Sequence, residues 1–285
     1  MRTGAPAAAT VGCTMTNDPA PRLISDDLVR LFELLEGADS VELKLTIPED
    51  SQRSTIAALG VDPLDAQIRQ VFFFDTPELA LNEAGVVLRA RRIQQRDSDT
   101  VVKLRPVVPT DLSPEFRSSP GFGVEVDAMP GGYVCSASLK GSLPPDAVLP
   151  SVSGDRSLST MFSEEQQRFF TAHAPTDLTI DDLSVLGPIF VLKLKLPKET
   201  FSRRIVVEMW LYPDGSRILE LSTKARPDEG FKVAVEVRQF LDEKGIEISG
   251  QQQTKTKAAL QFFSSELRAR PTTASQGTSR RAGTP

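Results

Sequence analysis

Residues 41–47 read Val-Glu-Leu-Lys-Leu-Thr-Ile, which is a strict alternation of apolar and polar side chains. Successive side chains of a β-strand point to opposite faces. The stretch therefore predicts a strand with aliphatic residues on one face and with Glu42, Lys44 and Thr46 on the other. The same period of two recurs along much of the chain, and it predicts a mainly β fold with a few added helices (α+β).

Eight further stretches show strand-like composition or alternation: residues 69–75, 86–94, 100–105, 122–128, 189–196, 204–212, 217–224 and 231–241. The turn Pro213-Asp214-Gly215-Ser216 predicts a hairpin between two of them. Helices are predicted over residues 26–36, 76–85, 163–173 and 254–268, where capping residues precede helix-forming segments. Residues 106–121 and 140–159 are rich in Pro, Ser and Gly and predict loops.

Composition and charge argue against some classes of protein. The formal net charge of −5 argues against a nucleic-acid binder that relies on bulk positive charge. No apolar run approaches the roughly 20 residues of a membrane span, and the N-terminus has no signal-peptide pattern. With only two cysteines, these features predict a cytoplasmic protein that does not contact a membrane. Residues 1–22 and 269–285 predict disordered tails around one domain at 23–268, and the sequence does not indicate an oligomeric state.

The polar faces of the predicted strands carry ionic residues in like-sign pairs. Arg89 and Arg91 share a face, and further pairs of this kind are Lys103 with Arg105, Glu125 with Asp127, and Lys193 with Lys195. Two interpretations remain open at this point. The sheet is half-buried with its charges in water, or these faces line the inside of a closed barrel whose apolar faces are covered by helices and loops.

In a barrel, the lumenal residues would be predominantly basic. The expected lumenal bases are Lys44, Arg89, Arg91, Lys103, Arg105, Lys193, Lys195, Lys224 and Arg238, and the expected acids are Glu42, Glu125, Asp127, Glu208, Glu220 and Glu236. Confined charges need partners, so an excess of bases predicts an anionic ligand. The carboxylates beside it predict Mg²⁺ (or Mn²⁺), which binds a few carboxylates together with phosphate oxygens.

These stretches resemble the CYTH superfamily, or triphosphate tunnel metalloenzymes, which includes thiamine triphosphatases, inorganic triphosphatases and a class of adenylate cyclases. Ser40-Val41-Glu42-Leu43-Lys44 is similar to the family's first-strand Glu-x-Glu-x-Lys motif, with Ser40 at the first Glu. Residues 74–81 followed by 84–91 resemble its strand–helix–strand segment, and residues 100–105 its next strand. Residues 235–237 and the Lys255/Lys257 pair resemble its closing elements.

The resemblance implies a closed antiparallel tunnel barrel of eight strands, in which Mg²⁺ or Mn²⁺ and basic residues hold a triphosphate while water attacks the terminal phosphorus. The positions that it assigns to phosphate binding are Lys44, Arg89, Arg91, Lys103, Arg105, Lys193, Lys195 and Lys224. It implies Glu42, Glu220 and Glu236 as metal ligands, with Glu125 and Asp127 either orienting the bases or binding metal.

The sequence departs from the family pattern at three places. Ser40 and Ala234 stand where carboxylates are expected, and residues 72–74 are Phe-Phe-Phe, without the Tyr that some triphosphatases use to ready the water. The leading hypothesis is metal-dependent hydrolysis of an inorganic or organic triphosphate. The alternatives are a non-catalytic polyphosphate- or nucleotide-binding module and adenylate cyclase-type cyclisation. Trp210, on the face of Glu208, is either a stacking partner for an organic ring or a packing residue.

Overall fold

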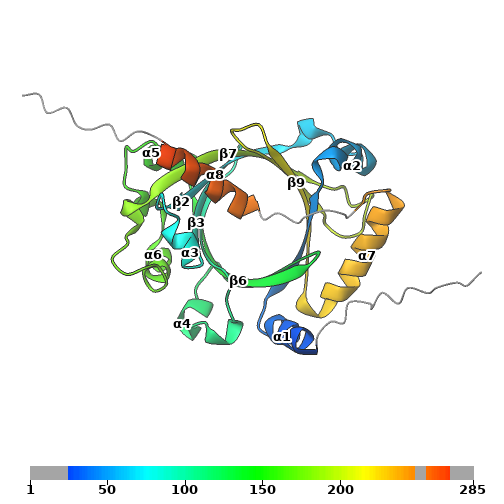
Figure 1. The fold of residues 1–285 in the computed structure, drawn as a ribbon, viewed down its shortest axis with the longest axis horizontal. Coiled ribbons are helices and arrows are strands. Elements are labelled where there is room, and N and C mark those ends of the chain that lie inside the picture. The colour runs from blue at the N-terminus through cyan, green and yellow to red at the C-terminus, as the bar shows by residue number, and fades with distance from the viewer. Residues whose placement is uncertain (1–24, 248–254, 270–285) are drawn as a thin grey trace, which may run out of the picture.

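Nine strands close into a barrel in the computed structural model, which describes residues 25–247 and 255–269 (Figure 1). The strands are β1 (Ser40–Ile47), β2 (Gln67–Asp75), β3 (Val86–Ile93), β4 (Ser98–Leu104), β5 (Phe122–Met129), β6 (Gly132–Leu143), β7 (Ser184–Lys195), β8 (Val206–Leu211) and β9 (Arg217–Ala225). Around the barrel they run in the order β1-β5-β6-β4-β3-β2-β7-β8-β9. The predicted tails lie almost entirely outside the described residues.

The barrel is mixed, whereas the expectation was eight antiparallel strands. β1 pairs with β5 in parallel, and every other neighbouring pair is antiparallel. The parallel register sets Ser40 opposite Glu125 and Glu42 opposite Asp127. This register brings the polar faces of two strands that are distant in sequence onto one wall of the lumen.

The predicted strand at 231–241 is wrong, because this segment belongs to helix α7 (Gly230–Glu243). Phe231, Val233, Val235 and Val237 do alternate, but only Val233 and Val237 of these four are buried. With Phe240 they form the three- to four-residue spacing of a helix.

Strand β6, which brings the number of strands to nine, was not predicted. It is rich in Ser and Gly, and its last residues fall in the predicted loop at 140–159.

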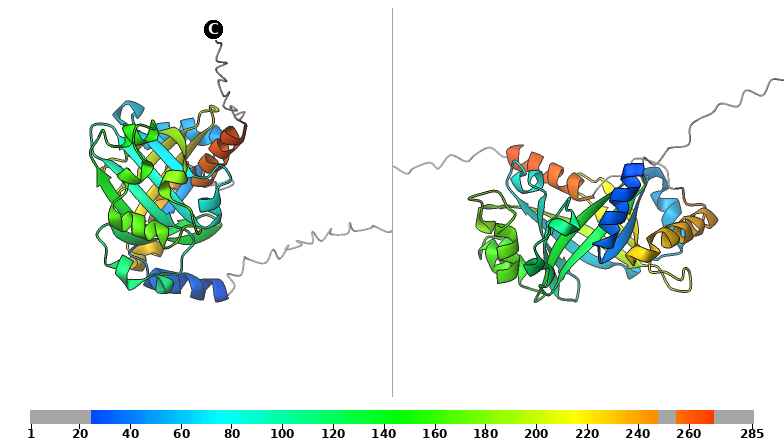
Figure 2. Two further views of the ribbon diagram at one scale, coloured as in Figure 1. Left: turned by 90° about the vertical axis from the view of Figure 1, so that its left-hand side faces the viewer. Right: turned by 90° about the horizontal axis from the view of Figure 1, so that it is seen from below.

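Helices cover the outside of the barrel and meet the apolar strand faces (Figures 1 and 2). They are α1 (Ser25–Glu36), α2 (Gln52–Leu59), α3 (Ala80–Glu83), α4 (Pro114–Arg117), α5 (Val148–Val152), α6 (Glu164–Thr171) and α7. The predicted helix at 76–85 is shortened to α3, because the Asp75 carboxylate accepts from the backbone of Thr76, Leu81 and Asn82. Of the helices that the structure describes, none combines the length and the hydrophobicity needed to cross a membrane.

Helix α8 (Lys255–Ala269) lies over one opening of the barrel (Figure 1). Its buried Ala259, Leu260 and Phe263 pack against apolar strand residues that include Phe73 and Trp210. This apolar contact fixes the first residue of the helix, Lys255, at the mouth of the tunnel.

Helix α6 is anchored to the barrel by Gln166, which is 1% exposed. Its side-chain amide donates to the Leu139 carbonyl, and its oxygen accepts from Thr100 and from the Ser163 backbone. Gln166→Ala would leave these buried groups without partners, so we expect the free energy of unfolding to fall by about 2–4 kcal/mol. Urea denaturation measures this, with exposed Gln239→Ala as the control. Equal midpoints for the two variants would contradict this role.

Candidate functional site

Three carboxylates meet on the wall formed by β1 and β5. One oxygen from each of Glu42, Glu125 and Asp127 lies within 4.8 Å of the others. The hydroxyl of Ser40 donates to Glu125 at 3.2 Å, across the parallel pair. Glu125 therefore brings a carboxylate beside the position where Ser40 interrupts the first-strand motif.

Asp127 is the most buried member of this cluster, with a side chain that is 0% exposed. Its oxygens lie 2.6 Å from Lys44 Nζ, 3.3 Å from Arg105 Nη2 and 3.6 Å from Lys103 Nζ. Burial alone would raise the pKa of Asp127, but the charges of Lys103, Lys44 and Arg105 outweigh it and lower the pKa to about 2. Asp127 thus stays ionised and holds three cations in place.

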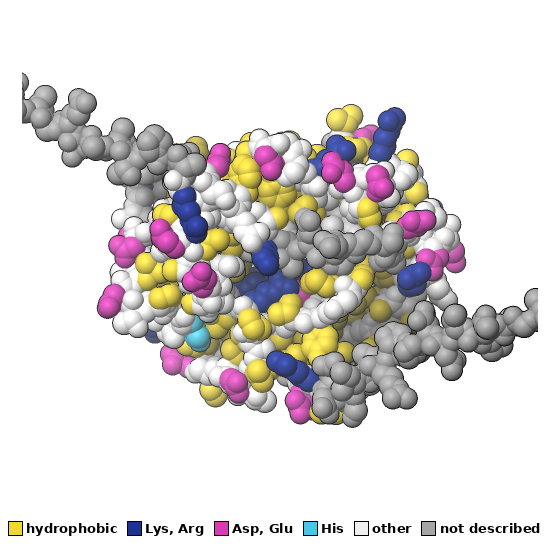
Figure 3. Space-filling model, viewed as in Figure 1, with side chains coloured by type: hydrophobic (Ala, Val, Ile, Leu, Met, Phe, Trp, Pro, Cys, Tyr) yellow, Lys and Arg dark blue, Asp and Glu magenta, His cyan; other side chains and the backbone are white. Residues whose placement is uncertain are grey.

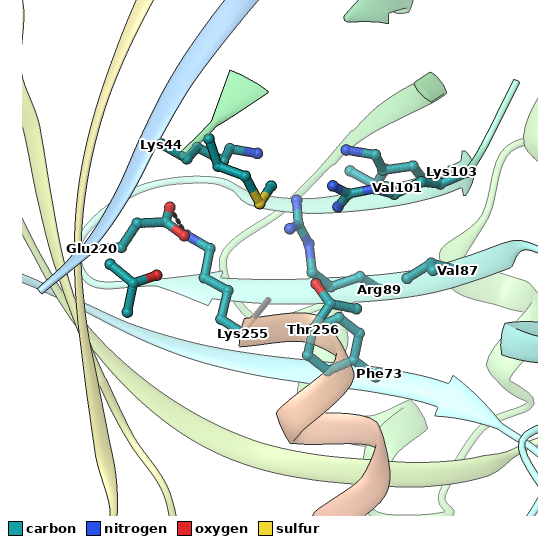
Figure 4. A pocket seen from close by; sticks show the side chains of 12 residues that line it. Lys44, Phe73, Val87, Arg89, Val101, Lys103, Glu220, Lys255 and Thr256 are labelled. Atoms are coloured by element: carbon teal, nitrogen blue, oxygen red, sulfur yellow. Dashed lines mark ion pairs between the residues drawn. The ribbon is translucent and has the colours of Figure 1, made fainter. Parts of the chain in front are cut away.

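The same three cations, with Arg89, line a cavity inside the barrel. Figure 4 shows Lys44, Arg89 and Lys103 reaching into one space from different strands, and Figure 3 shows Lys and Arg side chains deep in the central opening. Arg89 has no ion pair among the described residues, and its Nε is buried without a hydrogen-bond partner. Burial, followed by the nearby charge of Arg91, lowers the pKa of Arg89 to about 9. The charges of Asp99 and Glu208 oppose this shift without forming an ion pair with Arg89. A guanidinium that has no direct acidic partner and a buried, unbonded Nε is the strongest mark of an anion site in this lumen.

Further basic residues lie on β2, β3 and β7, and two of these have acidic partners. Arg91 forms a two-bond contact with Asp99, at 2.8 and 2.7 Å. Lys193 pairs with Glu208 at 3.2 Å. Arg69 bonds to Gln67 through its guanidinium, and burial, followed by the charge of Arg91, lowers its pKa.

The adjoining wall, where β9 pairs with β1 on one side and with β8 on the other, holds an internal cation. Glu208 and Glu220 lie directly opposite each other on β8 and β9, an arrangement in which like charges repel. Nζ of Lys255 lies 2.6 Å from Glu208 and 2.7 Å from Glu220, and 4.9 Å from the centre of the Trp210 ring. Burial lowers the pKa of Lys255, but both carboxylates oppose this effect and the net shift is upward. Trp210, 3% exposed, packs beneath this group.

The structure brings most of the predicted site residues into the lumen, with exceptions. Glu236 and Arg238 lie on α7, outside the barrel, where Glu236 pairs with Arg203 at 3.0 Å and Arg238 with Asp242 at 2.9 Å. The lumenal placement of both residues is therefore wrong. Lys195 is exposed at the end of β7, and Lys224, 53% exposed, pairs with Glu125.

Sequence reasoning missed three groups that the structure shows in or beside this site. Asp99 was missed because the predicted strand began at residue 100. Asp99 nevertheless lies on the same strand face as Val101 and Lys103. Arg69 was missed because its neighbours on the same face, Val71 and Phe73, are apolar. Lys255 comes from a helix, so no strand alternation marks it, and the resemblance singled out the Lys255/Lys257 pair without assigning it a place in the lumen.

The carboxylate cluster of Glu42, Glu125 and Asp127 fits a hard divalent cation by its donor atoms. All are oxygens and they converge from two strands. The Asp127 oxygen that lacks a hydrogen bond also lies 3.3 Å from Arg105 and 3.6 Å from Lys103, so it would be shared between these bases and the ion. Glu220 fits such an ion less well, because it lies outside this cluster, on β9, where its carboxylate pairs with Lys255.

Two solved structures resemble this chain over most of its length. A candidate adenylyl cyclase from Hippeastrum, described as having a dominant triphosphatase activity, is 18% identical with a TM-score of 0.56, over 78% of this chain and 94% of that one. A candidate adenylate cyclase from Bacillus halodurans is 13% identical with a TM-score of 0.53, over 77% and 97%. No family model and no curated sequence matches.

The protein is therefore a closed-barrel protein with a charged tunnel. More particularly, it shares its fold with two proteins described as candidate adenylate cyclases, in agreement with the fold class that the resemblance implied.

Replacing the internal cation tests its role in the barrel. In Lys255→Met, Glu208 and Glu220 would face each other without the lysine that bridges them, so we expect the free energy of unfolding at pH 7.5 to fall by about 2–4 kcal/mol. The deficit should shrink at pH 5, because unbridged carboxylates gain protons more easily. Exposed Lys257→Met is the matched control, and a deficit independent of pH would contradict this electrostatic role.

The pKa of Lys103 predicts how anion binding depends on pH. Burial lowers this pKa to about 8, although Asp127 opposes the shift. A bound polyanion would raise it, so binding takes up a proton above pH 8 and weakens as the pH rises. The Kd of inorganic triphosphate should rise about tenfold from pH 7 to pH 9 relative to Lys103→Arg, whose guanidinium stays protonated. Parallel pH profiles for the two proteins would refute this assignment.

Proposed function

We propose that this protein hydrolyses an inorganic or organic triphosphate, which binds in the basic part of the lumen. The hydrolysis requires a divalent metal. The observation that carries the proposal is the group of Lys44, Arg89, Lys103 and Arg105 around one cavity, with the Nε of Arg89 buried and Arg89 lacking an ion pair among the described residues. Phosphoryl transfer needs positioning and charge neutralisation more than covalent help from the protein. A confined group of cations supplies both.

Each set of residues has a distinct part in this proposal. Arg89 and Arg105 offer planar forks to phosphate oxygens, while Lys44 and Lys103 act as point charges. Arg91, Lys193, Lys195 and Lys224 remain proposed as outer contacts along the tunnel.

The carboxylates of Glu42, Glu125 and Asp127 would hold Mg²⁺ or Mn²⁺, which supplies further charge neutralisation at the phosphates. Asp127 also fixes the positions of three of the bases through its ion pairs.

A specific observation favours a second candidate, a non-catalytic polyphosphate-binding module. Phe73 lines the cavity beside Arg89, so the hydroxyl that some triphosphatases place on this strand is missing. Ser40 also leaves the first-strand motif short of one carboxylate. Such a module would hold the polyanion with or without metal, whereas a hydrolase needs metal for turnover. The remaining alternative, cyclisation of a nucleotide, would need in addition a site that selects the base.

Phosphate release separates the candidates. We expect release from inorganic triphosphate, ATP or thiamine triphosphate with Mg²⁺ or Mn²⁺ and none with EDTA. Glu42→Gln and Glu125→Gln should each reduce turnover by about 100-fold, the size of loss typical for electrostatic groups in such sites. Glu236→Gln, on the outside of the barrel, is the control and should retain activity. Binding of triphosphate without any release would refute hydrolysis and leave the binding module.

A further inference from the structure

A large groove lies beside the mouth of the tunnel, on the outer side of the β5–β6 hairpin. Its volume is about 1110 Å³, against about 100 Å³ for the basic cavity in the lumen. A third hollow, at the mouth itself, shares Arg105 and Met129 with the basic cavity, and it shares Gly85 and Gly132 with the groove. The three hollows therefore follow one another from the lumen, over the rim, to the outside.

The lining of the groove differs in chemistry from the lumen. Most of its side chains are apolar, among them Leu31 and Leu34 of α1 and Val107 and Leu112 of the segment after β4. Its charged members include Arg30 and Asp111, one of each sign, so the lining shows no excess of positive charge like that of the lumen. Such a surface suits an apolar group and offers little to a second polyanion.

Three glycines, Gly85, Gly131 and Gly132, lie on the rim between the tunnel and the groove. Gly85 and Gly131 have φ values of +73° and +88°, so the backbone itself requires glycine there. Gly132 is different, because its φ is not in the left-handed region and a Cβ atom there would meet nothing within 4 Å. Nothing in the fold demands glycine at 132, and its lack of a side chain keeps the rim low.

We infer that the ligand of this protein is an organic triphosphate whose group beyond the phosphates is large and apolar, and that this group crosses the rim at Gly132 and lies in the groove. The inference rests on the proposed function, because it places the phosphates on Arg89, Lys103 and Arg105. It makes inorganic triphosphate a weaker ligand, since that ion fills the lumen and leaves the groove unused.

A fluorescent probe tests this placement. The full chain is titrated in EDTA, which prevents metal-dependent turnover, with inorganic triphosphate, ATP and the N-methylanthraniloyl ester of ATP (mant-ATP). We expect mant-ATP to bind about tenfold more tightly than inorganic triphosphate, with a rise in fluorescence as its ring leaves water. Gly132→Trp should remove this gain and leave the affinity for inorganic triphosphate unchanged. Leu64→Trp, at a residue that is 91% exposed, is the matched control.

The outcomes separate this inference from the proposed function. Equal affinities for inorganic triphosphate and mant-ATP in the wild type would overturn the inference and leave the triphosphate site intact. The same holds if Gly132→Trp weakens both ligands equally. If inorganic triphosphate itself fails to bind the wild type, the proposed function fails, and the inference fails with it.

Discussion

Closure of the barrel confines charged side chains that an open sheet would leave in water. An ion that is removed from water loses hydration, and only close partners of opposite sign make its burial tolerable. Most lumenal charges have such partners: Asp127 holds Lys44, Lys103 and Arg105, and Lys255 bridges Glu208 and Glu220. Arg89 in the basic cavity has no such partner among the described residues, and Arg69 has only the amide oxygen of Gln67.

The lumen is divided into regions with different electrostatic balance. On the β8–β9 side, two opposed glutamates are neutralised by a lysine that the C-terminal helix delivers. On the β1–β5 side, the carboxylates converge to within 4.8 Å and retain oxygen donors for a cation. The excess of positive charge comes from β3 and β4, where Arg89 and Lys103 line the basic cavity. This division explains why the carboxylates are unequal candidates for metal binding, although all of them line one tunnel.

The sequence predicted much of this arrangement, because strands buried on one face alternate strictly. Eight of the nine observed strands, and the lumenal positions of Lys44, Arg89 and Lys103, follow from that period. The period failed at 231–241, where alternation coincided with helical spacing and placed Glu236 wrongly in the lumen. It also missed β6, whose small residues give little contrast between its faces.

Other features depend on contacts between distant parts of the chain. The parallel pairing of β1 with β5 sets Glu125 beside Ser40, and no local pattern encodes which strands become neighbours. Lys255 reaches the lumen only because the apolar face of α8 docks over the barrel opening. Sequence periodicity reports which face a side chain occupies, and tertiary packing decides which faces meet.

Binding of inorganic triphosphate to Arg89 variants tests the central claim most directly. In EDTA, triphosphate at about 100 times its Kd should stabilise the wild type by about 2.7 kcal/mol in chemical denaturation. Arg89→Met should lose most of this stabilisation. Arg92→Met should keep it, because Arg92 bonds to Gln70 and does not line the cavity. Equal stabilisation of the two variants, or none in the wild type, would contradict an anion site centred on the unpaired arginine of the lumen.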